Sequence, residues 1–127
     1  MSFVFGRILN LNPTQKVIAL FLLFIQLTSY LMTALINPGI PKLENLGFKD
    51  KGIEIKKCRE CFSYIRMDKK TRHCYQCKIC IEGYDHHCPW TSKCIGDNNI
   101  KLFYCFIIST FVLFVYMILL IAINGTL

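Results

Sequence analysis

Residues 73–94 read HCYQCKICIEGYDHHCPWTSKC, and this stretch decides how the middle of the chain folds. Seven of the eight cysteines and all three histidines lie between Cys58 and Cys94. Pairs spaced Cys-x-x-Cys begin at Cys58, Cys74 and Cys77, and they are the only internal repeat that the spacing indicates. Such a pair places two sulfurs on one metal ion, and zinc prefers four thiolate and imidazole ligands. We therefore expect a small zinc-binding module here.

Two apolar stretches lie on either side of this segment. Residues 17–36 contain no charged side chain, and residues 102–123 contain no charge, glycine or proline. Each is long enough to cross a hydrocarbon core of about 30 Å as a helix. A signal peptide would have a shorter apolar run and a small-residue cleavage site, which residues 35–38 do not provide. The chain is therefore predicted to be an α-helical membrane protein with two transmembrane helices flanking a small, loop-rich zinc-binding domain.

Composition divides the chain into segments with definite limits. They are an N-terminal tail (1–16), a transmembrane helix (17–36), a charged linker (37–57), the cysteine-rich two-zinc domain (58–101), a second transmembrane helix (102–123) and a C-terminal tail (124–127). Proline and glycine in Asn37-Pro38-Gly39 are expected to end the first helix.

The basic residues predict the orientation in the membrane. Thirteen of the 15 Lys and Arg lie between the apolar stretches, from Lys42 to Lys101, and the formal net charge is +7. The positive-inside rule places this segment in the cytosol, where reducing conditions favour metal binding over disulfides. We expect the basic residues to be attracted to anionic lipid headgroups. We expect no nucleic-acid partner. We expect an integral protein of the endoplasmic reticulum, Golgi or plasma membrane.

The number of ligands narrows the roles of the cysteines and histidines. Seven cysteines and three histidines offer ten candidate ligands, whereas two closed zinc sites use eight. Adjacent residues seldom bind one ion together, so His86, His87 and Cys88 should not share a metal. If His87 completes a site, His86 and Cys88 remain free, with Asp85 beside them. The alternative is that all of these residues bind metal and the module has no catalytic role.

A free Asp85, His86 and Cys88 set has the chemistry of an activated nucleophile. An ordinary thiol, with a pKa of about 8.5, is mostly protonated at neutral pH, and a neighbouring imidazole can accept its proton. Asp85 would orient the imidazole. Because the second apolar stretch follows closely, Cys88 is expected to lie near the membrane surface, within reach of acyl-CoA and of cysteines on lipid-anchored proteins.

The residues in this region resemble a known family. Asp85-His86-His87-Cys88-Pro89-Trp90, followed by Cys94-Ile95-Gly96-x-x-Asn99, is similar to the signature of the DHHC family of protein S-acyltransferases, or palmitoyltransferases. The resemblance implies that Cys88 takes a palmitoyl or other long-chain acyl group from acyl-CoA and passes it to protein cysteines. The alternative is a non-catalytic, membrane-tethered zinc module, or an inactive fragment of such an enzyme, that recruits protein partners.

The resemblance also implies individual roles. Cys88 would be the nucleophile, His86 the base and Asp85 its orienting group. Two structural Zn²⁺ ions would each have four ligands. One set is Cys58, Cys61, His73 and Cys80, and the other is Cys74, Cys77, His87 and Cys94. Lys93 stands where the family usually has Asn, and a nearby ammonium would favour the Cys88 thiolate.

Family members usually have four spans, so the chain is expected to be truncated relative to that architecture. Three alternatives follow from this expectation: a fragment of a larger enzyme, a reduced member that forms an oligomer, or an inactive chain. The expected partners are the lipid bilayer, acyl-CoA and membrane-associated protein substrates that have cytosolic cysteines.

Overall fold

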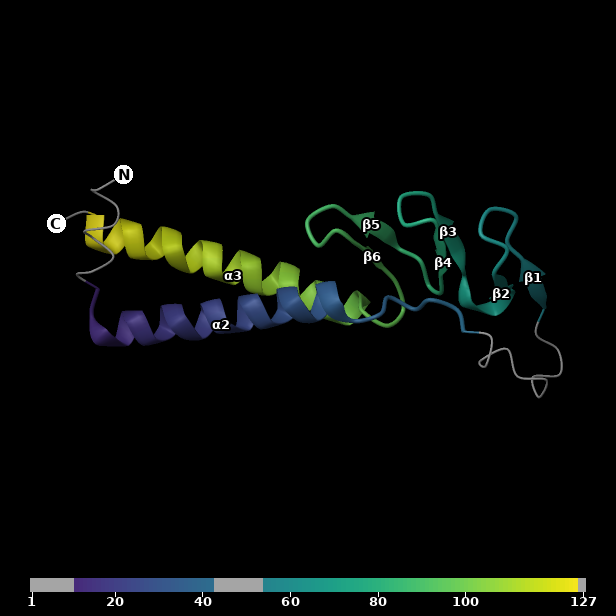
Figure 1. Cartoon of the computed structure of the whole chain (residues 1–127). Coiled ribbons are helices and arrows are strands. Elements are labelled where there is room, and N and C mark those ends of the chain that lie inside the picture. Colours follow the sequence, from purple (N-terminus) through teal and green to yellow (C-terminus); the bar gives the residue numbers. More distant parts are fainter. Residues whose placement is uncertain (1–10, 43–53, 126–127) are drawn as a thin grey trace.

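The computed structural model describes residues 11–42 and 54–125. Most of the expected N-terminal tail, residues 43–53 of the expected linker and residues 126–127 lie outside the described residues. The described parts contain two long helices and three short antiparallel hairpins (Figure 1). The helices lie side by side, and the hairpins follow one another in a row beyond one end of the helix pair.

Helix α2 (Pro13–Leu35) begins before the apolar run. Asn12 is its N-cap and Pro13 its first residue, where a missing backbone donor costs nothing. The Asn12 amide donates to Gln15 Oε1 at 3.0 Å, which extends the helix into a polar flank. At the other end, Asn37 Oδ1 accepts hydrogen bonds from the Gly39 and Ile40 amides and turns the chain.

Helix α3 (Ile100–Gly125) is also longer than the apolar stretch that predicts it. Mean hydropathy reaches 2.0 in α2 and 2.9 in α3, and both helices are long and apolar enough to cross a membrane. Most of their side chains are exposed rather than buried in the protein, which is unlike the core helix of a soluble domain.

Polar side chains connect the two helices halfway along their length. Gln26 of α2 donates from Nε2 to Thr110 Oγ1 at 2.7 Å and accepts from Ser109 Oγ at 2.6 Å. Ser29 Oγ lies 3.1 Å from Ser109 Oγ, so one hydroxyl donates to the other. Near the N-terminal end of α2, Tyr116 Oη of α3 donates to the Gln15 carbonyl at 2.9 Å. These contacts fix the rotation and register of α2 against α3.

Each hairpin pairs two strands of three residues. The pairs are β1 (Ile55–Lys57) with β2 (Tyr64–Arg66), β3 (Arg72–Cys74) with β4 (Ile79–Ile81), and β5 (His86–Cys88) with β6 (Lys93–Ile95). A single 3₁₀ turn, Met67–Lys69, follows β2. The loop-rich domain predicted from the sequence is therefore a series of hairpins. Spacing alone could not show this, because strands of three residues are too short for a periodic pattern.

The third hairpin is attached directly to the helix pair. Asn99, which is completely buried, donates from Nδ2 to the Thr33 carbonyl of α2 and the Cys94 carbonyl of β6, at 3.2 and 3.0 Å. Its Oδ1 accepts from the Gly96 amide at 2.9 Å. The segment after α2 adds backbone bonds, among them Glu82 N–H to the Gly39 carbonyl at 2.8 Å. One buried amide thus joins both helices to the module.

Candidate metal centres and active site

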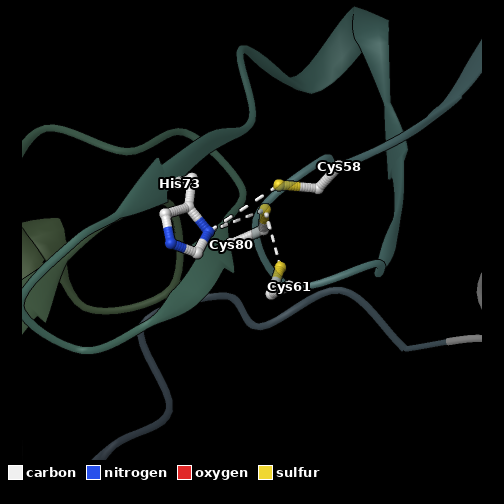
Figure 2. Close-up of side chains that lie close together, drawn as sticks. All are labelled: Cys58, Cys61, His73 and Cys80. Carbon is white, nitrogen blue, oxygen red and sulfur yellow. Dashed lines mark hydrogen bonds between the residues drawn. The ribbon is translucent and has the colours of Figure 1, made fainter.

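The first group of candidate ligands comes from two consecutive hairpins (Figure 2). The turn between β1 and β2 carries two cysteines, and β3 and β4 contribute a histidine and a cysteine that are direct partners in the strand register. Nδ1 of His73 lies 3.7 Å from the sulfur of Cys58 and 3.8 Å from that of Cys80. The members of this group are Cys58, Cys61, His73 and Cys80.

The second group repeats this arrangement one hairpin further along. Cys74 at the end of β3 and Cys77 in the turn that follows supply two sulfurs, and the paired positions of β5 and β6 supply a histidine and a cysteine. His87 Nδ1 lies 3.3 Å from the sulfur of Cys77 and 3.8 Å from that of Cys94. The members of this group are Cys74, Cys77, His87 and Cys94. Both groups contain the residues that the resemblance to the DHHC family implies.

Both groups fit a tetrahedral zinc ion. In each, the four ligand atoms lie within 4.8 Å of one another. Zinc–sulfur bonds of about 2.3 Å and zinc–nitrogen bonds of about 2.0 Å place tetrahedral ligands roughly 3.5 to 3.8 Å apart. The Cys61–Cys80 sulfur distance of 3.5 Å and the Cys77–Cys94 distance of 3.3 Å are close to this geometry. Three thiols and one imidazole are also a usual donor set for structural zinc.

The electrostatics of the two groups favour a cation. Burial raises the pKa of Cys80, and the thiols of Cys58 and Cys61 raise it further. Burial and the neighbouring thiols likewise raise the pKa of Cys94. One thiol of each group has the opposite shift: burial raises the pKa of Cys61 and of Cys74, but hydrogen bonds lower it by more. One thiolate in each group is therefore stabilised, whereas a second thiolate in contact with it is unfavourable without a compensating positive charge. A divalent cation supplies that charge, and it binds thiols only in their deprotonated form.

The metal groups join the hairpins in series. Each group combines the turn of one hairpin with the paired strand positions of the next, so the hairpin of β3 and β4 belongs to both groups. Strand alternation produces this arrangement, because adjacent residues of a strand point to opposite faces. His73 therefore belongs to the first group and Cys74 to the second.

The same alternation separates the three residues of the His-His-Cys run. Strand β5 contains His86, His87 and Cys88 in succession. His87 points to the second metal group, so His86 and Cys88 share the opposite face of the strand. Neither belongs to a metal group of the described residues. The structure thus leaves free the two residues that the ligand count left over.

His86 is held between an acid and an aromatic ring. Its Nδ1 lies 3.2 Å from Asp85 Oδ2, and both side chains are partly exposed. Its ring meets that of Phe103 in α3 edge to face, with 5.1 Å between centroids. These contacts leave Nε2 as the nitrogen available for proton transfer. The arrangement matches a base whose orientation is fixed by a carboxylate.

Cys88 lies in a site that stabilises its thiolate. The residue is 1% exposed. Burial raises the pKa of Cys88, but the Thr91 hydroxyl, the backbone amides of Thr91 and Trp90, and the imidazole of His86 together lower it by more, so the net shift is downward. A lowered pKa increases the fraction of nucleophilic thiolate at neutral pH.

Lys93 has a different contact from the one its position suggests. It is the direct strand partner of Cys88, which explains the expectation that its charge would act on the thiol. Its Nζ instead donates to the Leu35 carbonyl at the C-terminal end of α2, at 3.1 Å. A cation at this end of a helix interacts favourably with the helix dipole. Lys93 therefore links the third hairpin to α2.

Two residues of the site were not identified from the sequence. The sequence shows Asn99 only as part of the family motif. Its structural role cannot be predicted from the sequence, because its three hydrogen-bond partners are backbone groups. Thr91 was missed entirely, although it is almost completely buried close to the Cys88 thiol. A signal for Thr91 was present: its position relative to His87 and Cys88 repeats that of Cys77 relative to His73 and Cys74.

Fold and site together define a class of protein: a membrane-associated chain in which two long apolar helices carry a zinc-type cysteine-rich module with a spare cysteine beside a histidine and an aspartate. Residues 51–124 match the family model described as DHHC palmitoyltransferase. Because this match covers more than half of the sequence, the chain belongs to the DHHC palmitoyltransferase family.

Curated relatives agree with this assignment. The chain is 41% identical to human palmitoyltransferase ZDHHC3 in an alignment that covers 67% of this chain and 30% of the relative. It is 36% identical to human palmitoyltransferase ZDHHC9, over 60% of this chain and 20% of the relative. A probable protein S-acyltransferase 6 of Arabidopsis thaliana is 35% identical over 63% of this chain and 19% of the relative. The chain thus spans less than a third of the length of these relatives.

Proposed function

We propose that this chain carries the active site of a protein S-acyltransferase and that Cys88 is the residue that becomes acylated. One observation carries the proposal: Cys88 is excluded from both metal groups and lies beside an imidazole that contacts a carboxylate. The names of the curated relatives, which are palmitoyltransferases and an S-acyltransferase, support the same reaction. The donor would be a long-chain acyl-CoA such as palmitoyl-CoA.

The proposed reaction has two half-reactions. In the first, His86 accepts the thiol proton and the Cys88 sulfur attacks the thioester carbonyl carbon of acyl-CoA. The new carbon–sulfur bond forms, the bond to the CoA sulfur breaks, and the CoA thiolate leaves with the proton from His86. In the second, a substrate cysteine transfers its proton to His86 and attacks the acyl carbon, and Cys88 leaves as a thiolate. Asp85 stabilises the imidazolium that forms in each step.

The metal groups have a structural role in this proposal. Zinc would hold the three hairpins in a row and so keep the short run from Asp85 to Cys88 in a fixed shape. The donor atoms within 4.8 Å of one another support two closed, four-ligand sites with no position for a catalytic water.

The proposed setting is a membrane with the module on its cytosolic face. The apolar lengths of α2 and α3 support two crossings, and the basic residues between them support a cytosolic module, which we assign to residues 58–101. Asn99 and Lys93 connect the third hairpin to α2, which would place Cys88 next to the headgroups. Substrates would then be membrane-associated proteins with cysteines close to the cytosolic surface.

Self-acylation tests the proposal. The zinc-loaded chain, purified in detergent, is incubated with labelled palmitoyl-CoA, and we expect a hydroxylamine-sensitive thioester on the peptide that contains Cys88. The Cys88→Ser variant should lose the label while it keeps two zinc ions, because Cys88 is not a ligand. Cys105→Ser is the matched control, since this exposed cysteine of α3 belongs to neither metal group. Two bound zinc ions without a label would instead favour the non-catalytic recruiting module.

A further inference from the structure

The second and third hairpins are copies of one unit. His87-Cys88-x-x-Thr91-x-x-Cys94 repeats His73-Cys74-x-x-Cys77-x-x-Cys80 position by position. Strands β3 and β4 pair in the same register as β5 and β6, with the histidine opposite the final cysteine in each unit. Buried isoleucines, Ile81 and Ile95, follow that cysteine. The internal repeat is therefore longer than the Cys-x-x-Cys pairs that spacing indicated.

The turns of all three hairpins have the same backbone shape. The residue after the second ligand position has a positive φ in each: 58° at Phe62, 57° at Lys78 and 50° at Ser92. A positive φ is uncommon outside glycine, so three instances at the same position indicate one turn type. In the first two turns this shape directs two cysteine sulfurs toward the same metal site. In the third turn the corresponding residues are Cys88 and Thr91.

Thr91 is the inward-facing residue of a turn whose other side chains face outward. Trp90 is 80% exposed and Pro89 and Ser92 are also exposed, whereas Thr91 is only 6% exposed. Its hydroxyl is completely buried and makes no hydrogen bond within the described parts of the chain. The equivalent turn of the second hairpin shows where this hydroxyl lies: there the sulfurs of Cys74 and Cys77 are within 4.8 Å of each other, and the Cys77 amide donates to the Cys74 sulfur at 3.5 Å.

An unpaired buried hydroxyl destabilises a folded protein, because it loses its bonds to water. Such a group is expected where function requires it. Catalytic hydrogen bonds are often long before substrate binds and shorten only in the reacting complex. The turn therefore presents a hydrogen-bond donor that the Cys88 sulfur can accept from when it is negatively charged.

We propose that Thr91 is a further catalytic residue whose hydroxyl donates a hydrogen bond to the sulfur of Cys88 whenever that sulfur carries negative charge. This inference rests on the proposed S-acyl transfer. The charge is present when Cys88 attacks the acyl-CoA carbonyl carbon, and it returns when the substrate sulfur bonds to that carbon and the bond to Cys88 breaks. In the third turn a hydroxyl thus takes the place of the second thiolate, and the first cysteine remains free to react.

Removing only the hydroxyl tests this role. Thr91→Val keeps the shape of the side chain, and Thr91→Ser keeps the donor. We measure three quantities on the zinc-loaded chain: the rate of labelling at Cys88 with palmitoyl-CoA, the rate at which the label passes to a cysteine peptide, and the midpoint of thermal unfolding. Zinc content is determined alongside, because neither variant removes a ligand.

We expect Thr91→Val to lower the reaction rates without lowering the thermal stability. Thr91→Val should slow both half-reactions roughly ten- to a hundredfold, which is typical for loss of a hydrogen bond to a charged group. It should leave the unfolding midpoint unchanged or raise it, since an unpaired hydroxyl is replaced by a methyl group. Thr91→Ser should retain most of the rate. A merely structural Thr91 would not give this separation.

Three outcomes would overturn the inference, and they are distinguishable. If wild type and Thr91→Val acquire and transfer the label at equal rates, the hydroxyl has no catalytic role and the proposed function stands. If the wild-type chain acquires no label, the proposed function fails, and the role of Thr91 fails with it. If Thr91→Val loses zinc or structure, Thr91→Ser decides: a slow, folded Thr91→Ser chain also contradicts donation by the hydroxyl.

Discussion

His86 and His87 are adjacent in one strand, yet they face different environments. Strand geometry turns His87 toward three cysteine sulfurs and His86 toward Asp85 and Phe103. Neighbouring residues of the same type therefore provide an internal comparison between a metal ligand and a base.

We predict that His86→Gln lowers the rate of labelling at Cys88 by about a hundredfold or more, the usual effect of losing a general base. Its zinc content should remain at the wild-type value. His87→Gln should instead lose zinc from the second group, which metal analysis by mass spectrometry detects. Equal zinc loss in both variants would contradict the separation of roles, as would a fully active His86→Gln.

Asn99 is the second residue of interest, because its buried side-chain amide connects the third hairpin to a helix. Its three hydrogen bonds connect the Thr33 carbonyl of α2, the Cys94 carbonyl of β6 and the Gly96 amide between β6 and α3. We expect Asn99→Ala to lower the free energy of unfolding by about 2 to 4 kcal/mol, because three buried backbone groups lose their partners. The measurement is denaturant unfolding in detergent. Asn98→Ala is the control, because the Asn98 side chain is exposed. A comparable loss of stability in Asn98→Ala would argue against a specific role of Asn99.

Sequence reasoning narrows the choice of site residues most where chemistry limits the possible roles. Zinc takes four ligands, so ten candidates for two sites left a spare pair, and the structure keeps His86 and Cys88 out of both metal groups. Thr91 and Asn99 have no such constraint. A threonine or asparagine acquires its role from burial and from distant partners, which are properties of the folded chain.

At the scale of elements, the polar cluster between α2 and α3 has the clearest energetic role. In the proposed membrane setting, an apolar side chain gains little from leaving lipid for a helix contact, so hydrogen bonds and close packing would specify the pairing. Gln26 contacts both Ser109 and Thr110, and the Tyr30 ring lies 5.6 Å from that of Phe106 nearby.

We predict that Gln26→Leu weakens the pairing of the helices by about 1 kcal/mol, the usual size of a hydrogen bond between membrane helices. Unfolding in mixed micelles, followed by circular dichroism, measures the change. Thr28→Val is the matched control, because the Thr28 hydroxyl donates within its own helix to the Phe24 carbonyl at 2.7 Å. An equal effect in both variants would mean that the cluster does not specify the pairing.

The helices and the hairpins differed in how far they could be predicted. Long uncharged runs predict both helices. Each helix nevertheless extends beyond its apolar stretch, because Asn12 caps α2 ahead of that stretch and α3 includes Lys101 and Asn124. The strands are too short to leave a periodic pattern. Their register depends instead on turns that ligand spacing imposes, so the hairpins are recognisable only after the metal groups are assigned.

At the scale of the whole molecule, stability comes from two separate sources. The helix pair relies on backbone hydrogen bonds and the polar cluster, whereas the hairpins bury few apolar side chains, chiefly Ile81 and Ile95. A module of this size rarely folds by apolar burial alone, so metal binding should provide most of its stability.

We therefore predict that chelation unfolds the hairpins and leaves the helices intact. After treatment with a strong chelator, the helical signal in circular dichroism should change little, while amides of β1 to β6 lose protection from hydrogen exchange. Adding Zn²⁺ back should restore the protection. Loss of α2 and α3 together with the hairpins would show that the two parts fold as one cooperative unit.

The hairpin of β3 and β4 contributes ligands to both metal groups, and this sharing makes the two binding events thermodynamically linked. An ion in either group orders that hairpin, so a second ion meets ligands whose conformational entropy has already been lost. Linkage is reciprocal, so each ion must raise the affinity for the other by the same factor. Singly loaded chains should therefore be scarce at every zinc concentration, and the run that contains Cys88 should become ordered in an all-or-none manner.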